Sequence, residues 1–175
     1  AALILKPHIE DSADVCVGVP VIDKDRCTAC GRCSAFCMYK ALATLPNGAI
    51  VFPELCNGCG GCKIACPEDA ISMGERVIGK ISYGKCDEMN FAEGLLNVGE
   101  ARCRPVISEL VKADFGGTMI IDCPPGTACP AVEATKDADF VLLVAEPTPF
   151  GINDFRLAAD MLRMLKKPFG AVINK

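Results

Sequence analysis

From about residue 76 onward, apolar runs of strand length alternate with segments of helical periodicity. Three β-branched runs bounded by turn residues are predicted to be strands, at residues 118–121, 140–145 and 169–173. Helical patterns precede these runs and begin near Pro105, Pro130 and Asn153. This order predicts an α/β fold with a parallel sheet, right-handed crossovers and helices covering the sheet.

The earlier part of the chain has a different pattern, in which short apolar runs are separated by cysteine-rich loops. Residues 41–55 hold two apolar runs around Asn47-Gly48, a dipeptide typical of a hairpin turn. A group of four cysteines lies on each side of this segment, and the two groups repeat with a period of 29 residues. We expect each copy to form a strand, a loop and a short helix, related to the other copy by an approximate two-fold axis.

The two groups of cysteines share the spacing C-x2-C-x2-C-x3-C. They are Cys27, Cys30, Cys33 and Cys37, followed by Cys56, Cys59, Cys62 and Cys66. This run holds iron–sulfur clusters in bacterial two-cluster ferredoxins, where the fourth cysteine binds the cluster of the other copy. The spacing predicts two [4Fe-4S] clusters, the first on Cys27, Cys30, Cys33 and Cys66 and the second on Cys56, Cys59, Cys62 and Cys37. Pro67 follows the second group as that pattern requires, whereas Met38 follows the first.

Two other uses of these cysteines fit the sequence less well. A disulfide framework needs an oxidising compartment, and the chain begins with no export signal. Zinc uses C-x2-C pairs but gives no reason for a third and fourth cysteine at these intervals. The five cysteines outside the two groups, among them Cys123 and Cys129, are expected to be mainly inert buried thiols.

Composition limits the classes of function. The chain has 175 residues, about half of them apolar, and a net charge of −4, which offers no electrostatic basis for binding nucleic acid. No apolar run reaches the length of a membrane span. Many reduced thiols without an export signal predict a cytoplasmic protein.

The three predicted strands end in polar residues that could form a ligand site. Asp122 follows the first strand and Asn174 the third, while Gly126 lets backbone N–H groups approach an anion. In a parallel sheet, ligands bind beyond the carboxyl ends of the strands, so we expect these residues to share one edge. Residues 74–80 resemble a phosphate-binding loop, but the next residue is Ile81, where that loop has a serine or threonine hydroxyl. We therefore interpret the resemblance as accidental and expect no phosphate site there.

Several segments resemble a known family. The segment IIDCPPGT at residues 120–127 resembles the switch II region of the MinD/ParA/Mrp superfamily of P-loop ATPases, and EPTPFG and VINK resemble later landmarks of that fold. Three further segments narrow the resemblance: LKP at residues 5–7, FPELCNGCGGC at residues 52–62 and LNVGEA at residues 96–101. Together with the doubled ferredoxin motif, they make the chain similar to MinD-like ATPases with an inserted two-cluster ferredoxin domain. The resemblance implies a nucleotide-binding domain at residues 1–19 and 76–175, divided by a ferredoxin domain at residues 20–75.

The resemblance also implies roles for single residues. Asp122 would correspond to the switch II aspartate near Mg²⁺ and the γ-phosphate, Gly126 to the same loop, and Asn174 to an adenine contact. In that family the P-loop precedes the position that matches Ala1. A full-length protein would therefore be an ATPase that binds ATP and Mg²⁺ and forms a nucleotide-dependent homodimer, while this chain alone is predicted to be inactive.

These observations together predict an iron–sulfur electron-transfer protein coupled to a MinD-like ATP-binding domain, with a redox protein or cluster acceptor as partner. One alternative is a plain electron carrier whose α/β part only docks partners. The other is an assembly scaffold whose clusters are cargo. Cluster lability separates them, because a scaffold should lose iron to an apo-acceptor and a carrier should not.

Overall fold

The computed structural model describes residues 2–113 and 115–174. The chain divides into two compact units, and each is described by itself. One, here called the cysteine unit, consists of Ala13–Lys80 and Leu96–Ala101. The other, here called the C-terminal unit, takes the residues up to Ser12, Ile81–Leu95 and those from Arg102 onward. Along the sequence, the cysteine unit is therefore inserted into the C-terminal unit.

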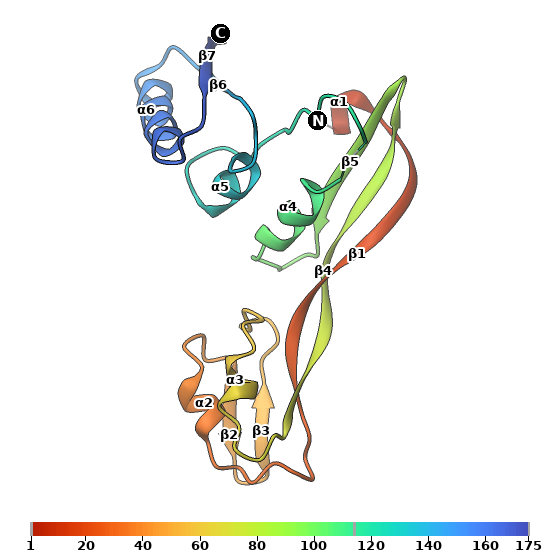
Figure 1. The fold of residues 1–175 in the computed structure, drawn as a ribbon, viewed down its shortest axis with the longest axis vertical. Coiled ribbons are helices and arrows are strands. Elements are labelled where there is room, and N and C mark those ends of the chain that lie inside the picture. Colours follow the sequence, from red (N-terminus) through yellow and green to blue (C-terminus); the bar gives the residue numbers. More distant parts are fainter. Residues whose placement is uncertain (1, 114, 175) are drawn as a thin grey trace. The chain divides into compact units, whose positions relative to one another are not determined.

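A three-stranded sheet supplies long strands to both units. Its strands are β1 (His8–Ile22), β4 (Ile71–Cys86) and β5 (Met89–Leu96), with β4 in the middle (Figure 1). Residues 74–80, which resemble a phosphate-binding loop, lie inside β4. An extended strand has no turn that could wrap a phosphate, so this segment is structural, as interpreted above.

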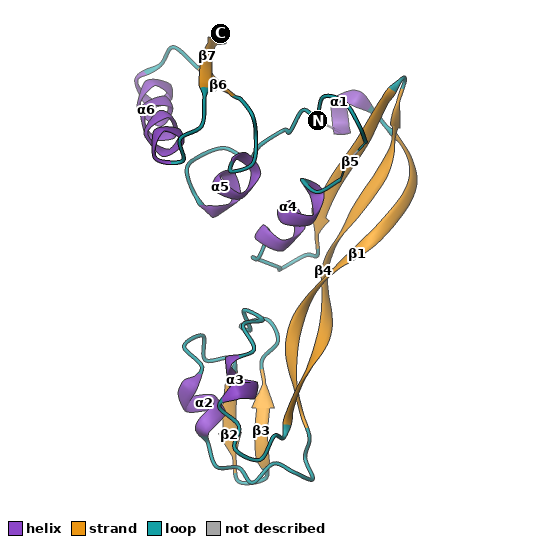
Figure 2. Ribbon diagram, viewed as in Figure 1, coloured by secondary structure: helices purple, strands orange, loops and turns teal. Residues whose placement is uncertain are grey.

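A β-hairpin and two short helices complete the cysteine unit. The hairpin pairs β2 (Leu42–Leu45) with β3 (Gly48–Val51), and the helices are α2 (Arg32–Phe36) and α3 (Gly61–Ile64) (Figure 2). The predicted hairpin is confirmed, with its two-residue turn at Pro46-Asn47, one residue earlier than expected. Gly48 already pairs with Leu45 and has a φ of 126°, a conformation that favours glycine.

The backbone of the cysteine unit repeats with the 29-residue period of the sequence. Positive φ angles recur at Ala29 and Gly58, at Gly31 and Gly60, and at Lys40 and Asp69. The hydrogen bond from Asp23 N–H to Ala70 O is mirrored by the one from Phe52 N–H to Ala41 O, both 2.8 Å long. Each of these bonds joins one copy to the other, so the predicted two-fold relation of the copies is confirmed.

The core of the cysteine unit contains four buried residues: Cys33, Leu42, Cys62 and Ile71. Ile22, Cys37, Ala49, Val51 and Cys66 pack against them. Half of this cluster is therefore cysteine, and its members form pairs 29 residues apart. The unit also buries Val15, Ala41, Cys56, Ala70 and Ile78.

The C-terminal unit contains four helices and a pair of parallel strands among its described residues. They are α1 (Ala2–Leu5), α4 (Arg104–Leu110), α5 (Cys129–Thr135), β6 (Val141–Ala145), α6 (Pro149–Met164) and β7 (Phe169–Ile173). Thr148 caps the N-terminus of helix α6, where its hydroxyl accepts the Gly151 N–H at 3.0 Å. The helix buries Ala159 and Leu162 on one stripe. The three predicted helices and the last two predicted strands are thus confirmed.

The predicted strand at residues 118–121 is wrong, because this segment has no regular secondary structure. A strand needs a neighbour that accepts and donates backbone hydrogen bonds. Strands β6 and β7 pair with each other, and residues 118–121 pair with neither of them. Ile120 is 90% exposed, as expected for a segment without such a neighbour. Full coverage of the sheet is also wrong for the described residues, since Leu142 and Val144 on one face of β6 are exposed.

Candidate metal centre

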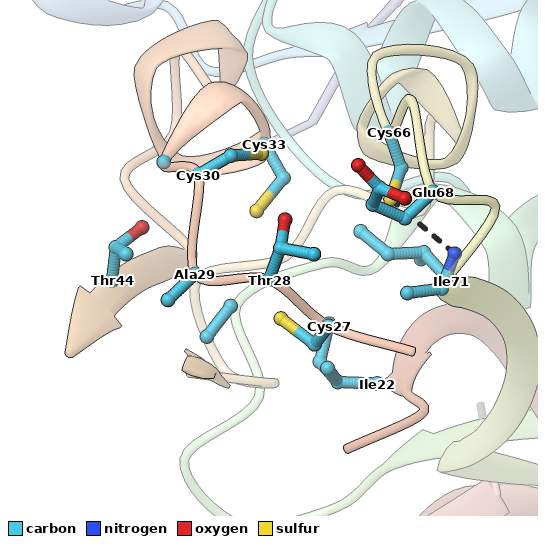
Figure 3. A pocket seen from close by; sticks show the side chains of 13 residues that line it. Ile22, Cys27, Thr28, Ala29, Cys30, Cys33, Thr44, Cys66, Glu68 and Ile71 are labelled. Carbon is cyan, nitrogen blue, oxygen red and sulfur yellow. Dashed lines mark hydrogen bonds between the residues drawn. The ribbon is translucent and has the colours of Figure 1, made fainter. Parts of the chain in front are cut away.

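Four cysteines from both copies of the repeat line one pocket of the cysteine unit (Figure 3). Cys27, Cys30 and Cys33 come from the first loop and helix α2, whereas Cys66 comes from the end of the second copy. These are the four residues that the spacing predicts for one cluster. The rest of the lining is mostly apolar and includes Ile22, Ala49 and Ile71, while Thr28, Thr44 and Glu68 are its polar side chains.

The backbone around this pocket is shaped to bring the four sulfur atoms inward. Ala29 and Gly31 have φ angles of 54° and 78°, which turn the loop sharply before α2 begins. Gly48 lies beside Cys27, since a side chain at position 48 would begin 3.8 Å from Cys27 Sγ, an ordinary contact distance. The Ala70 N–H donates to Cys66 Sγ at 3.3 Å, which stabilises negative charge on that sulfur.

The second loop repeats this arrangement. Cys56 and Cys62 are buried, Cys37 is half-buried and Cys59 is exposed. The Gly58 N–H donates to Cys56 Sγ at 3.4 Å, and the loop turns through Gly58 and Gly60 with φ angles of 69° and 72°. The thiols, amide donors and tight turns that fit a cluster in the first copy are thus present in the second.

Burial changes the acidity of the innermost thiols. Desolvation raises the pKa of Cys33 and of Cys62 above the ordinary thiol value, with smaller opposing contributions from backbone N–H groups. Neighbouring cysteines raise these pKa values further, since like charges repel. Without metal these two side chains are therefore neutral thiols, and iron binding displaces their protons.

Among residues 2–113 and 115–174, no three histidine, cysteine or carboxylate side chains converge closely enough to hold a single metal ion. A cubane does not require such convergence, because each cysteine binds a different iron atom. The two sets of four thiols, the apolar walls and the N–H donors fit two [4Fe-4S] clusters.

The predicted nucleotide residues do not form the expected edge. Asn174 follows β7 and its N–H donates to Ala145 O at 2.9 Å, so Asn174 lies beside the end of β6. Asp122 and Gly126 lie in the irregular segment between α4 and α5, where Gly126 has a φ of 89°. Because residues 118–121 form no strand, Asp122 does not stand at the carboxyl end of one. Burial and the nearby Asp122 carboxylate raise the pKa of Cys123.

Sequence reasoning missed two acidic residues with defined surroundings. Glu68 lines the cysteine pocket, and its position just after Cys66-Pro67 was a signal of this placement. Glu133 is 5% exposed and accepts hydrogen bonds from Arg104 Nε at 2.8 Å and Lys136 Nζ at 2.7 Å. These bonds hold the pKa of Glu133 below its usual value. Only the i,i+3 spacing of Glu133 and Lys136 could have indicated this network.

Comparison with known families agrees with the geometry of the cysteine unit. The sequence matches two families, each described as a 4Fe-4S binding domain, over residues 19–42 and 46–72. Each match contains one of the two groups of cysteines. Neither match reaches the region from residue 76 onward. The chain therefore carries two ferredoxin-type 4Fe-4S binding domains, one in each copy of the repeat.

The chain is similar to several archaeal proteins. Two uncharacterized proteins of Methanocaldococcus jannaschii are 32% and 33% identical over 79% and 86% of this chain and over 52% and 54% of their own lengths. A polyferredoxin protein of Methanothermus fervidus is 33% identical over 61% of this chain and 21% of its own length. The chain spans about half the length of the first two relatives.

What these matches show is two ferredoxin-like 4Fe-4S binding domains within residues 19–72. No helix formed by its described residues is long and apolar enough to cross a membrane.

Proposed function

We propose that the chain holds two [4Fe-4S] clusters in the cysteine unit and transfers electrons as one module of a longer protein. Cys27, Cys30, Cys33 and Cys66 would hold the first cluster. Cys56, Cys59, Cys62 and Cys37 would hold the second. The observation that carries the proposal is the single pocket lined by Cys27, Cys30, Cys33 and Cys66, which come from both copies of the repeat.

A bound [4Fe-4S] cluster supplies reversible storage of one electron. The residues of the chain would set how readily that electron is accepted. The N–H groups of Ala70 and Gly58 donate to Cys66 and Cys56 and stabilise negative charge on these sulfur atoms. Ile22, Ala49 and Ile71 keep water from one side of the first pocket, while the Glu68 carboxylate disfavours additional negative charge there.

Burial of the inner ligands favours a resident redox centre over a cargo site. Cys33 and Cys62 are 8% and 7% exposed and pack with Leu42 and Ile71, so an acceptor could reach the exposed ligands Cys30 and Cys59 but not these two. A scaffold that hands over its clusters needs ligands that an acceptor can reach. Incubation of the loaded protein with an apo-ferredoxin tests this point, and transfer of iron to the acceptor within minutes would favour the scaffold.

The content of iron and sulfide tests the central proposal. Protein purified without oxygen should be brown and carry about eight iron and eight sulfide per chain, as two cubanes require. Cys66→Ala should damage the cluster of the first loop, and Cys37→Ala that of the second, whereas the exposed Cys16→Ala should leave both intact. Paramagnetic resonance of the reduced variants identifies the damaged cluster. Zinc without sulfide would contradict the proposal, and damage confined to the mutated copy would contradict the exchange of ligands.

A nucleotide-linked role for the C-terminal unit is a second and finer proposal. The observation in its favour is the parallel β6–α6–β7 segment, which ends at Asn174 beside β6. In the longer cytoplasmic protein, Asp122, Gly126 and Asn174 would then contribute to an ATP and Mg²⁺ site completed by residues outside this chain. Because this chain has no P-loop lysine, it should show no ATPase activity and should bind ATP only weakly, with a Kd of about 1 mM or higher. Calorimetry that shows micromolar binding would contradict this view.

A further inference from the structure

The two copies of the repeat have closely related backbones but different outer surfaces. Five exposed apolar or aromatic side chains surround the second cysteine loop, and we call this set the collar: Phe36, Met38, Tyr39, Leu55 and Ile64. The residues 29 positions away, around the first loop, are much smaller or charged: Ala65, Pro67, Glu68, Arg26 and Ala35. Since the core residues of the copies match, this difference is confined to their surfaces.

Contacts bring the collar residues of the first copy to the second loop. The Phe36 ring lies against Gly61, the first residue of α3, so closely that a side chain at position 61 would overlap it. Tyr39 lies at the opposite end of the loop, where its hydroxyl accepts a hydrogen bond from Asn57 Nδ2 at 3.1 Å. Ile64 is three residues after Gly61 and hence on the same side of the α3 turn. Met38, between Phe36 and Tyr39, is 89% exposed.

The second loop has two lysines whose counterparts 29 positions away are not basic. Lys40 and Lys63 are exposed. Lys40 directly follows Tyr39 in the chain, and Lys63 directly precedes Ile64. Their counterparts 29 positions away are Asp69, which lies beside the first loop and pairs with Arg26 at 3.7 Å, and Ser34. Glu54 is matched by Asp25 and does not distinguish the copies. The surface at the second loop is therefore apolar with a basic rim, on a chain whose net charge is −4.

We propose that a one-electron redox protein with an acidic rim around an apolar docking face binds at the collar. This inference rests on the proposed function, because a cluster at the second loop gives the partner a reason to dock there. Exposed aromatic and methionine side chains are typical of the centre of an interface, and Lys40 and Lys63 complement an acidic rim. On docking, one electron would pass between the redox centre of the partner and a cluster held by Cys37, Cys56, Cys59 and Cys62, with no bond formed or broken.

An acidic flavodoxin is a suitable probe of this surface. Its affinity for the loaded chain is measured by calorimetry at low and high salt, for the wild type and for Lys40→Glu/Lys63→Glu. We expect the charge variant to bind on the order of tenfold more weakly and with less dependence on salt. Lys85→Glu/Lys166→Glu is the matched control, because both lysines are exposed in the C-terminal unit and the double replacement changes the net charge equally. This control should bind flavodoxin within about twofold of the wild type, because it leaves the lysines beside the collar unchanged.

A second pair of variants tests the apolar part of the collar. Met38→Ser/Ile64→Ser should weaken flavodoxin binding about tenfold at any salt concentration. Leu3→Ser/Ile4→Ser is the matched control, since these residues are 93% and 86% exposed in the C-terminal unit. Cross-linking of flavodoxin carboxylates to lysine, followed by mass spectrometry, should identify Lys40 or Lys63.

The outcomes separate this inference from the function on which it rests. If the collar variants keep their iron and sulfide but bind flavodoxin like the wild type, the docking site is wrong and the clusters stand. The same holds if the loaded wild type does not bind flavodoxin at low salt, or if cross-links fall on lysines of the C-terminal unit. If the wild type carries no clusters at all, the proposed function itself fails.

Discussion

The cysteine unit and the C-terminal unit are stabilised by different means. In the cysteine unit, two of the four residues of one core cluster, Cys33 and Cys62, are proposed metal ligands, so removal of iron would loosen that part of the core. In the C-terminal unit, Leu162 and Ala159 are almost fully buried and an ionic network encloses Glu133. The difference teaches that one chain can combine a part that depends on its cofactor with a part that packs by itself.

Removal of iron should have the largest effect and should break this comparison most clearly. Chelation under reducing conditions should abolish amide-exchange protection in β2, β3, α2 and α3, because cluster ligation supplies most of the stability of the cysteine unit. Helix α6 and strands β6 and β7 should keep their protection. If amide protection persists in the hairpin after iron is removed, the apolar core of the cysteine unit is enough to keep it folded, and this prediction is wrong.

Truncation of the aliphatic core should affect the other unit. Leu162→Ala should destabilise the C-terminal unit by about 2–5 kcal/mol, because Leu162 is 0% exposed and the cavity cannot refill fully. Leu157→Ala, at a position 53% exposed on the same helix, is the control and should cost less than about 1 kcal/mol. Exchange rates in α6 and β6 report the effect, and cluster absorbance should not change. A loss of clusters in Leu162→Ala would contradict the independence of the units.

Acid should produce the smallest effect. The hydrogen bonds from Lys136 and Arg104 lower the pKa of Glu133, so this carboxylate stabilises the fold above its ordinary pKa near 4.5. That contribution is lost as the pH falls through the lowered folded-state value. Thermal unfolding of the C-terminal unit should therefore shift downward between pH 5 and about pH 3 in the wild type and less so in Glu133→Gln. Glu109→Gln, which removes an exposed ion pair with Lys112, is the control, and its unfolding temperature should depend on pH as that of the wild type does.

The features that could be predicted from the sequence are those fixed by short-range chemistry. The cysteine spacing, the hairpin at residues 42–51 and the stripe of Ala159 and Leu162 depend on residues close together in the chain. The pocket set of Cys27, Cys30, Cys33 and Cys66 is less local, but it follows from the repeat once the two copies are related by a two-fold axis. Local periodicity and repeat symmetry therefore indicated most of the cysteine unit.

The features that failed depend on partners distant in the sequence. Residues 118–121 have the composition of a strand, but composition does not supply a neighbouring strand. Conversely, β1 and β4 are long strands without regular alternation, and β4 contains glycines that allow a close neighbour. At Gly84, for example, a side chain would begin 2.1 Å from His8 O, so the paired backbone fixes this glycine. The buried place of Glu133 likewise depends on Arg104, in another helix.

The reciprocal hydrogen bonds of the cysteine unit have a consequence for assembly kinetics. Asp23 N–H bonds to Ala70 O and Phe52 N–H to Ala41 O, so each bond spans the exposed Pro46-Asn47 turn. If the chain were cut at that turn, both contacts would become intermolecular, and each fragment would lack the fourth ligand of its own loop. Reassembly would then be second order in fragment concentration, whereas the intact turn holds each copy at a high effective concentration of the other.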